Sequence, residues 1–240
     1  MSDLPAIAIP SHGRIKSLRT TTLRWLEREE YPLHKIYIFV APEEVAQYTV
    51  AFPEYQVIQG GDGYSAQMQA ISDYFPLREI LFICHDDIKR IKYLNSEISL
   101  KENIISLIKM MNLNSAGLGG WNPNSDQRCM SERYTTTLTH LVGSCYLCAN
   151  RNFVSDLMEV EDYHRSVEFF IRDKKVIRYK GGGVDTKYNS GSGGLAAEDR
   201  MTRKKRDCDA LAARYPTAAA SIIKRDMPDI KLNWRFRVVG

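Results

Sequence analysis

The sequence predicts an α/β domain in which a mostly parallel sheet is flanked by helices. Short apolar runs rich in β-branched and aromatic residues recur through the first 84 residues, and segments with helical spacing of apolar residues separate them. Proline or glycine follows several of these runs, as at Pro10 and Gly60. Such alternation is typical of parallel sheets with crossover helices, which bind ligands beyond the carboxyl ends of their strands.

The first part of the chain contains four expected strands. They are residues 6–9, 36–40, 55–58 and 80–84. A helix is expected at 15–26, and it ends before Pro32 because proline disfavours the helical state of the preceding residue. A second helix is expected around 68–75, where apolar residues again recur at helical spacing.

The second part of the chain is less regular. Ser99 and Glu102 have the spacing of a capping box, which predicts that a helix begins there. The remaining expected elements are a loop at 121–124, a strand at 141–147, a strand or hairpin at 169–179, a glycine-rich loop at 181–194 and a helix from about 196 to 214. Residues 234–238, in which aromatic and basic residues alternate, are expected to form an edge strand or else to stack a base and bind phosphate.

The composition is that of one globular domain. With 240 residues, of which 44% are hydrophobic and 26% charged, the chain can bury a single core, so residues 1–240 are treated as one domain. No apolar run is long enough to span a membrane, and the N-terminus lacks the features of a signal peptide. The five cysteines, an odd number, are more typical of reduced thiols in the cytoplasm than of a disulfide framework.

The charge is distributed unevenly. Residues 1–150 hold 14 Lys/Arg against 16 Asp/Glu, whereas residues 151–240 hold 19 against 13. The excess of positive charge in residues 151–240 predicts either a phosphate-rich partner for this part of the chain or simply solvated helix faces. Arg200, Arg203 and Lys204 belong to a basic cluster where the backbone of a nucleic acid would be bound.

Two aspartates, Asp86 and Asp87, directly follow the apolar run 80–84. Adjacent like charges at the end of a buried strand are costly unless a cation or donor compensates them. Mg²⁺ or Mn²⁺ would do so, since each binds carboxylate and phosphate oxygens together. The pair therefore predicts a metal site for a nucleotide diphosphate, or else acids that only cap the next turn.

A second acidic pair, Glu198 and Asp199, follows Gly193–Gly194 at the start of an expected helix. A carboxylate at the rim of an active site can take the proton of an attacking hydroxyl. First-turn acids are also favoured by the helix dipole without any catalytic role. Both interpretations stay open from the residues alone.

The connections after the first and third strands carry the other candidate ligand-binding residues. Gly13 allows the backbone of Ser11–Arg14 to approach a ligand closely, and Arg14 offers a partner for a diphosphate. Gly61 and Asp62 would shape the pocket for a base and ribose. The alternatives are an ordinary surface arginine and a plain turn.

These motifs in this order resemble the TET/JBP-associated glycosyltransferases, a family of relatively small GT-A transferases found largely in phages. The resemblance covers most of residues 5–215 and is carried by 9–14, 85–87, 187–189 and 193–199. His85 stands where the first aspartate of the GT-A signature often stands, and no histidine follows Asp199 to complete a metal site. His140 and His164 are the alternatives for that late histidine.

The resemblance implies a single GT-A domain with a nucleotide-sugar half at about 1–150 and a basic acceptor part at about 151–240. It implies transfer of a sugar from a nucleotide donor, expected to be a UDP-sugar, to a hydroxymethylated pyrimidine such as 5-hydroxymethylcytosine in DNA. The transfer would be assisted by Mn²⁺ or Mg²⁺ and would invert the anomeric carbon, in the host cytoplasm if the protein is phage-encoded. Neither a membrane nor an obligate protein partner is implied.

The roles that the resemblance implies fall into four groups. Asp87 and His85 would hold the metal, and Asp199 would be the general base with Glu198 beside it. The donor would be bound by Ser11, His12, Gly13, Arg14, Gly61, Asp62 and Asp86. The acceptor DNA would meet Lys187, Tyr188, Arg200, Arg203 and Lys204.

Other functions remain compatible with the sequence. The same transferase could act on a protein, a glycan or a small molecule. A non-catalytic DNA-binding module would need neither Asp87 nor Asp199. A metal-dependent nuclease fits less well, because its acids usually accompany a catalytic lysine in a different order.

Overall fold

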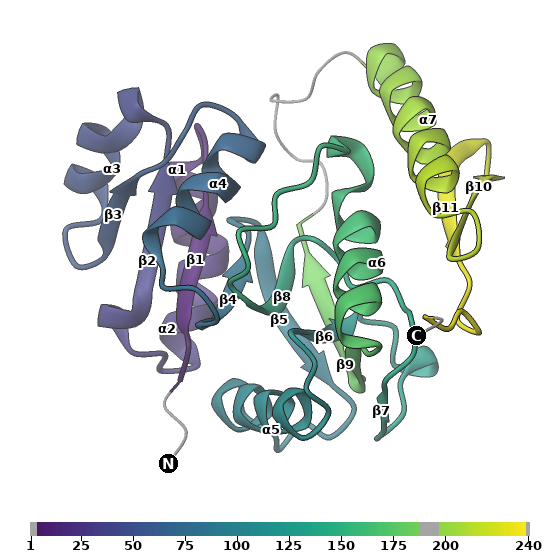
Figure 1. The fold of residues 1–240 in the computed structure, drawn as a ribbon. Coiled ribbons are helices and arrows are strands. Elements are labelled where there is room, and N and C mark those ends of the chain that lie inside the picture. The colour runs from purple at the N-terminus through teal and green to yellow at the C-terminus, as the bar shows by residue number, and fades with distance from the viewer. Residues whose placement is uncertain (1–3, 188–196, 239–240) are drawn as a thin grey trace.

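Four parallel strands form one half of the central sheet, in agreement with the predicted alternation of strands and helices. The computed structural model describes residues 4–187 and 197–238, with the backbone alone for 197–199; Figure 1 draws the undescribed residues as a thin grey trace. The strands have the spatial order β3 (Gln56–Gln59), β2 (Ile36–Val40), β1 (Ala6–Pro10) and β4 (Ile80–Cys84).

The other half of the sheet is mixed. Beyond β4 lie β8 (Cys145–Ala149), β6 (Leu118–Asn122), β9 (Ile177–Thr186) and β5 (Ile88–Tyr93), and the short β7 (Tyr134–Thr135) pairs with β9. Strand β8 is antiparallel to both of its neighbours, and β5 and β7 are antiparallel to β9. Six of the nine strands nevertheless run in one direction, so the predicted mostly parallel α/β sheet is confirmed.

Helices cover both faces of the sheet, and β1 presents apolar side chains to each of them. Ile7 and Ile9 belong to one core cluster, whereas Ala6 and Ala8 face the other. The predicted helix at 15–26 is observed as α1 (Ile15–Leu18), a π turn (Arg19–Leu23) and α2 (Arg24–Arg28). The remaining helices are α3 (Val45–Ala51), α4 (Tyr64–Tyr74), α5 (Leu100–Leu113), α6 (Glu161–Asp173) and α7 (Ala197–Arg214).

Short 3₁₀ turns join several of these elements, at Leu33–Lys35, Pro42–Glu44, Gln127–Cys129 and Met158–Val160. The capping box is present as predicted: Ser99 Oγ accepts from the backbone N–H of Glu102, whose side chain accepts from the Ser99 N–H. No helix of the described residues is long and apolar enough to cross a membrane. Each of the five cysteines is a free thiol.

The prediction of a strand or hairpin at 169–179 was wrong for its first part, although residues 177–179 do begin β9. Residues up to Asp173 belong to α6, where Phe169 and Phe170 lie on the buried face, and Lys174 ends the helix in the left-handed conformation. A run of aromatic residues cannot distinguish a buried helix face from a strand without longer periodicity.

The predicted loop at 181–194 was wrong for its first residues, because β9 continues to Thr186. A Cβ at Gly182 would lie only 2.6 Å from Trp121 Cδ1, so the glycine leaves room for aromatic side chains. The rest of that predicted loop lies outside the described residues, apart from Lys187. Trp121 and Asn122, expected in a loop, belong to β6, and β8 begins at Cys145 rather than at 141.

The C-terminal segment differs most from the prediction. An antiparallel hairpin of β10 (Ala219–Lys224) and β11 (Met227–Leu232) packs against α7, and residues 234–238 form no strand. Arg225 and Asp226 both have positive φ at the tip, which is the geometry of a tight hairpin turn. Figure 1 shows this unit of α7, β10 and β11 at one side of the main sheet, next to α6.

Candidate functional site

Asp86 is held by two residues of the connection that follows β1. Because β1 and β4 are parallel neighbours, their carboxyl ends meet at one edge of the sheet. Ser11 Oγ donates to Asp86 Oδ2 at 2.8 Å, and Arg14 Nη1 donates to Asp86 Oδ1 at 3.2 Å. Burial raises the pKa of this carboxyl, which is 4% exposed, whereas these two donors lower it. The structure therefore brings together three of the residues predicted to bind the donor.

Asp87 is different, because its Oδ1 is buried and has no hydrogen-bond partner in the described part of the chain. Burial raises the pKa of Asp87, and the neighbouring Asp86 raises it further. The backbone N–H of Lys187 donates to Asp87 O at 2.9 Å, so β9 ends beside the acidic pair. A buried carboxylate oxygen without a donor is where a cation would compensate the charge.

The described residues contain no group of three His, Cys, Asp or Glu arranged to hold a metal ion. Mg²⁺ is typically bound through one or two carboxylates together with substrate phosphates and water, so a site for this ion does not need three protein ligands. Asp87 offers the free oxygen for such an ion, while Asp86 is already engaged by Ser11 and Arg14.

His85 lies between the acidic pair and α4. Its Nε2 is 3.3 Å from Tyr64 Oη, and the two rings meet edge to face with centroids 5.4 Å apart. Burial lowers the pKa of His85 to about 4, and the charges of Arg165 and Arg14 act in the same direction. The imidazole is therefore neutral at pH 7, which is the form that ligates metals.

The connection after β1 is clamped to the connection after β2. The Gly13 N–H donates to Glu44 Oε1 at 2.7 Å, and His12 Nδ1 lies 3.1 Å from Glu44 Oε2. Tyr48 Oη lies 2.9 Å from Ser11 Oγ and accepts from the backbone N–H of Arg14 at 2.9 Å. Gly13 has a φ of 65°, a conformation that favours glycine at this turn.

The loop with Gly61 and Asp62, which was predicted to bind the sugar donor, lies close to the same edge. Gln67 Nε2, from α4, donates to Ser11 O at 3.0 Å and ties this helix to the β1 connection. Gly61 packs so closely on Ala66 that a Cβ would lie 2.4 Å from the alanine Cβ, and Asp62 is exposed. The loop is thus in position to border a ligand bound over Ser11.

A second acidic pair, Glu161 and Asp162, lies at the same edge and was missed from the sequence. Glu161 Oε1 accepts from Tyr64 Oη at 3.3 Å, so the tyrosine hydroxyl contacts both Glu161 and His85. Ser144 O accepts from the His85 N–H at 2.8 Å, and Gly143 N–H lies 3.4 Å from Asp162 Oδ2. The loop 143–144 therefore contacts both acidic elements.

Asp162 is ionised and paired with a histidine. Its Oδ2 lies 2.7 Å from His140 Nε2. Burial alone would raise the pKa of Asp162, but the charge and hydrogen bond of His140 lower it to about 2. The signal that could have identified this pair is the run of two acids in the first turn of a strongly amphipathic helix, which the misassigned strand concealed.

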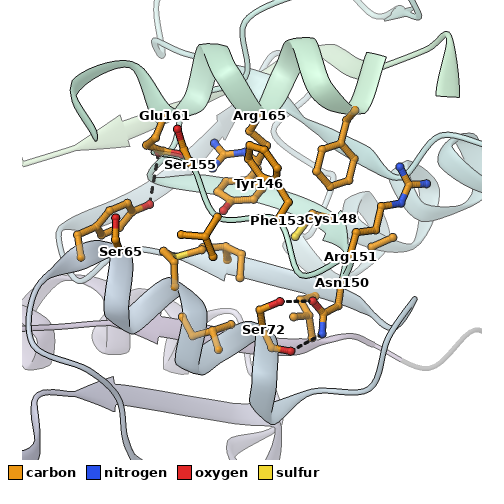
Figure 2. A pocket seen from close by; sticks show the side chains of 18 of the residues that line it. Ser65, Ser72, Tyr146, Cys148, Asn150, Arg151, Phe153, Ser155, Glu161 and Arg165 are labelled. Carbon is orange, nitrogen blue, oxygen red and sulfur yellow. Dashed lines mark hydrogen bonds and ion pairs between the residues drawn. The ribbon is translucent and has the colours of Figure 1, made fainter. Parts of the chain in front are cut away.

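A pocket extends from Glu161 between α4 and α6. Figure 2 shows side chains from both helices and from β8 directed toward one space, with Ser65 and Glu161 near one end and Ser72 with Asn150 at the other. Arg165 donates through Nη1 to Glu161 Oε2 at 2.5 Å, and its guanidinium lies 3.6 Å from the Tyr146 ring centroid. Between its polar ends the pocket is mostly apolar.

The remaining predicted residues fall around α7. Glu198 and Asp199 are at the start of this helix, but their side chains and the whole of Tyr188 lie outside the described residues. Arg200 Nε donates to Glu159 Oε2 at 3.2 Å, and Arg203 Nη2 donates to Glu159 Oε1 at 3.2 Å. Both arginines that were predicted to meet DNA therefore pair with one carboxylate.

No family model matches the chain, and no curated protein matches it. Solved structures share its fold at low identity. A mannosyltransferase from Pyrobaculum calidifontis, solved in complex with GDP-Man and Mn²⁺, is 11% identical with a TM-score of 0.54, over 90% of this chain and 64% of that one. Residues 1–349 of S. aureus TarS are 8% identical with a TM-score of 0.52, over 99% of both chains, and a mycobacterial protein is 7% identical with a TM-score of 0.52, over 97% and 84%. The chain therefore has a GT-A-like α/β fold.

Proposed function

We propose that this protein is a glycosyltransferase that moves a sugar from a nucleotide diphosphate donor to an acceptor hydroxyl. The observation that carries the proposal is the meeting of two acidic elements at one edge of the sheet. Asp86, beside Asp87, accepts from Ser11 of the connection after β1. Glu161 contacts Tyr64, and Asp162 contacts loop 143–144. Inverting transfer needs this combination, one acid for the donor side and one for the acceptor side.

The donor side would be formed by Arg14, Asp86 and Asp87. The Arg14 side chain is 48% exposed, so one of its N–H groups can donate to the diphosphate while Ser11 still donates to Asp86. Asp87 would hold Mn²⁺ or Mg²⁺ through its free oxygen, and the ion when bound would neutralise charge on the leaving diphosphate. A mannosyltransferase of the same fold was solved with GDP-Man and Mn²⁺, which supports this assignment.

The acceptor side has two candidate bases. Asp162 is ionised and is fixed by His140, whereas Asp199 was favoured by the sequence order. We assign the role to Asp162, because its helix is tied to the Asp86–Asp87 edge through Tyr64 and loop 143–144. Asp162 would accept the proton of the acceptor hydroxyl as the oxygen bonds to the anomeric carbon. The bond from that carbon to the phosphate oxygen breaks, and the diphosphate leaves with the electron pair.

The acceptor proposed is a hydroxymethylated pyrimidine in DNA, as the family resemblance implies. The positive excess of residues 151–240 supports a polyanionic acceptor. A buried base would have to leave the stack to reach the sugar donor.

The test is incubation with 5-hydroxymethylcytosine DNA, Mn²⁺ and a panel of UDP- and GDP-sugars, followed by mass spectrometry of the nucleosides. A gain of one hexose or N-acetylhexosamine mass with one donor is expected. Unmodified cytosine DNA is the control. The absence of any mass gain, together with donor hydrolysis that does not depend on Asp87, would overturn the proposal.

A further inference from the structure

The basic residues of α7 are largely neutralised within the fold. Besides the pairs with Glu159, Lys205 contacts Asp209, Arg206 contacts Asp207, and Arg214 contacts Asp156. Such residues gain less from binding phosphates, because each already has a carboxylate partner within the chain. The cluster singled out from the sequence is therefore a weak candidate for binding a polyanion.

The segment that follows α7 has the opposite character. Residues 219–238 contain five Lys/Arg and two Asp. Four of these cations are exposed, and none pairs with a carboxylate of the described residues: Arg225, Lys231, Arg235 and Arg237. Lys224 lies 3.9 Å from Asp229.

An exposed aromatic residue stands among these cations. Trp234 is 58% exposed, whereas Trp25 and Trp121 are buried. The Arg235 guanidinium lies 4.7 Å from the Trp234 ring centroid. An aromatic face beside unpaired cations is what binds single-stranded or flipped bases together with their phosphates.

The hairpin contacts the helix that carries the candidate base. Tyr163 Oη donates to Asp229 Oδ1 of β11 at 3.0 Å, and the Tyr163 ring stacks on His140 at 4.1 Å between centroids. His140 in turn holds Asp162. Asp229 thus ties the hairpin to the first turn of α6, and Phe236 packs on Phe170 near the end of that helix with ring centroids 5.9 Å apart.

We propose that the β10–β11 hairpin and residues 233–238 form a docking surface for a nucleic acid, with phosphates on the four unpaired cations and a base on Trp234. The inference rests on the proposed function, because the docked strand would carry the acceptor base. An anionic membrane is the other polyanion to consider. Membrane-surface elements present a continuous apolar face, whereas here Ile223, Met227 and Trp234 are separated by charged or polar residues.

The binding test uses a fluorescein-labelled 20-nucleotide DNA and needs no sugar donor. Lys231→Glu is expected to weaken binding by about fivefold or more, and Arg225→Glu with Arg235→Glu further, with a smaller salt dependence in each case. Lys109→Glu, an equal charge change at an exposed site on α5, is the matched control and should change affinity less than about twofold. Equal weakening by Lys231→Glu and Lys109→Glu, or no binding by the wild type, would overturn the proposal.

Trp234 fluorescence separates the two polyanions. DNA should quench it, and Trp234→Leu should remove the quenching, because the other two tryptophans are buried. Phosphatidylglycerol vesicles should leave the emission maximum unchanged. A blue shift with vesicles, without quenching by DNA, would assign the surface to membranes instead.

Transfer to the free nucleoside 5-hydroxymethyldeoxycytidine distinguishes this inference from the proposed function. The hairpin variants should keep that activity while losing transfer to DNA. If the chain binds DNA through the hairpin but modifies neither substrate, the docking surface stands and the proposed function fails.

Discussion

The Ser11 hydroxyl donates a 2.8 Å hydrogen bond to the Asp86 carboxylate, although 75 residues separate them in the chain. Removing one partner of a buried polar pair leaves the other unsatisfied, so Ser11→Ala should lower the free energy of unfolding by about 1–3 kcal/mol. Urea unfolding measures this change. Ser17→Ala, on α1, is the control and should stay within about 0.5 kcal/mol of the wild type. Equal stabilities for the two variants would contradict the structural role of Ser11.

Asp87→Asn should separate activity from stability. The variant removes the carboxylate that would hold the cation, so transfer should fall by about 100-fold or more. The melting temperature should stay constant or rise, because a buried like charge beside Asp86 is removed. Asp73→Asn, at an exposed site on α4, serves as the control for both assays. A variant with full activity at every Mn²⁺ concentration would exclude Asp87 as the metal ligand.

Asp162→Asn should lower kcat by about 100- to 10,000-fold with little change in KM, because an amide cannot accept the hydroxyl proton. Asp199→Asn should change kcat far less. Steady-state kinetics on both variants decide between the two acids, with circular dichroism to confirm folding. The reverse order of effects would return the role of base to Asp199.

The pairing of Asp162 with His140 predicts a pH dependence of stability. The folded-state pKa of Asp162 is lowered to about 2, so its contribution is complete above the ordinary aspartate value and is lost as the pH falls toward 2. The stability advantage of the wild type over Asp162→Asn should therefore shrink by on the order of 2 kcal/mol between pH 5 and pH 2. Urea titrations at several pH values measure it, and a constant difference would show that the ion pair adds nothing.

His85 should stay neutral far below the usual range of histidine. Burial and two nearby arginines lower its pKa to about 4, so its NMR ring signals should not shift between pH 8 and pH 5. Because folding lowers this pKa, His85 should cost stability as the pH falls through 6.5 toward 4. A transition near pH 6.5 would show that the ring is not buried against Tyr64.

The strands from β1 to β4 could be predicted because each is a short apolar run bounded by loop residues. The acidic pair after β4 was identifiable for the same reason, since charge at the end of an apolar strand stands out. The helix α6 and its Glu161–Asp162 pair were missed, because the run Phe169–Ile171 reads equally as strand or helix. Only packing on the sheet shows that it is helical.

By itself the sequence determined the α/β class, the four parallel strands and the position of Asp86 and Asp87. These depend on local patterns of apolar residues, which are present in the chain before it folds. The tertiary structure alone decided that Ser11 and Arg14 hold Asp86, and that Glu161 meets His85 through Tyr64. It also decided that Arg200 and Arg203 of α7 pair with Glu159. Those contacts join residues far apart in the sequence, so they exist only once crossovers and strand order bring them together.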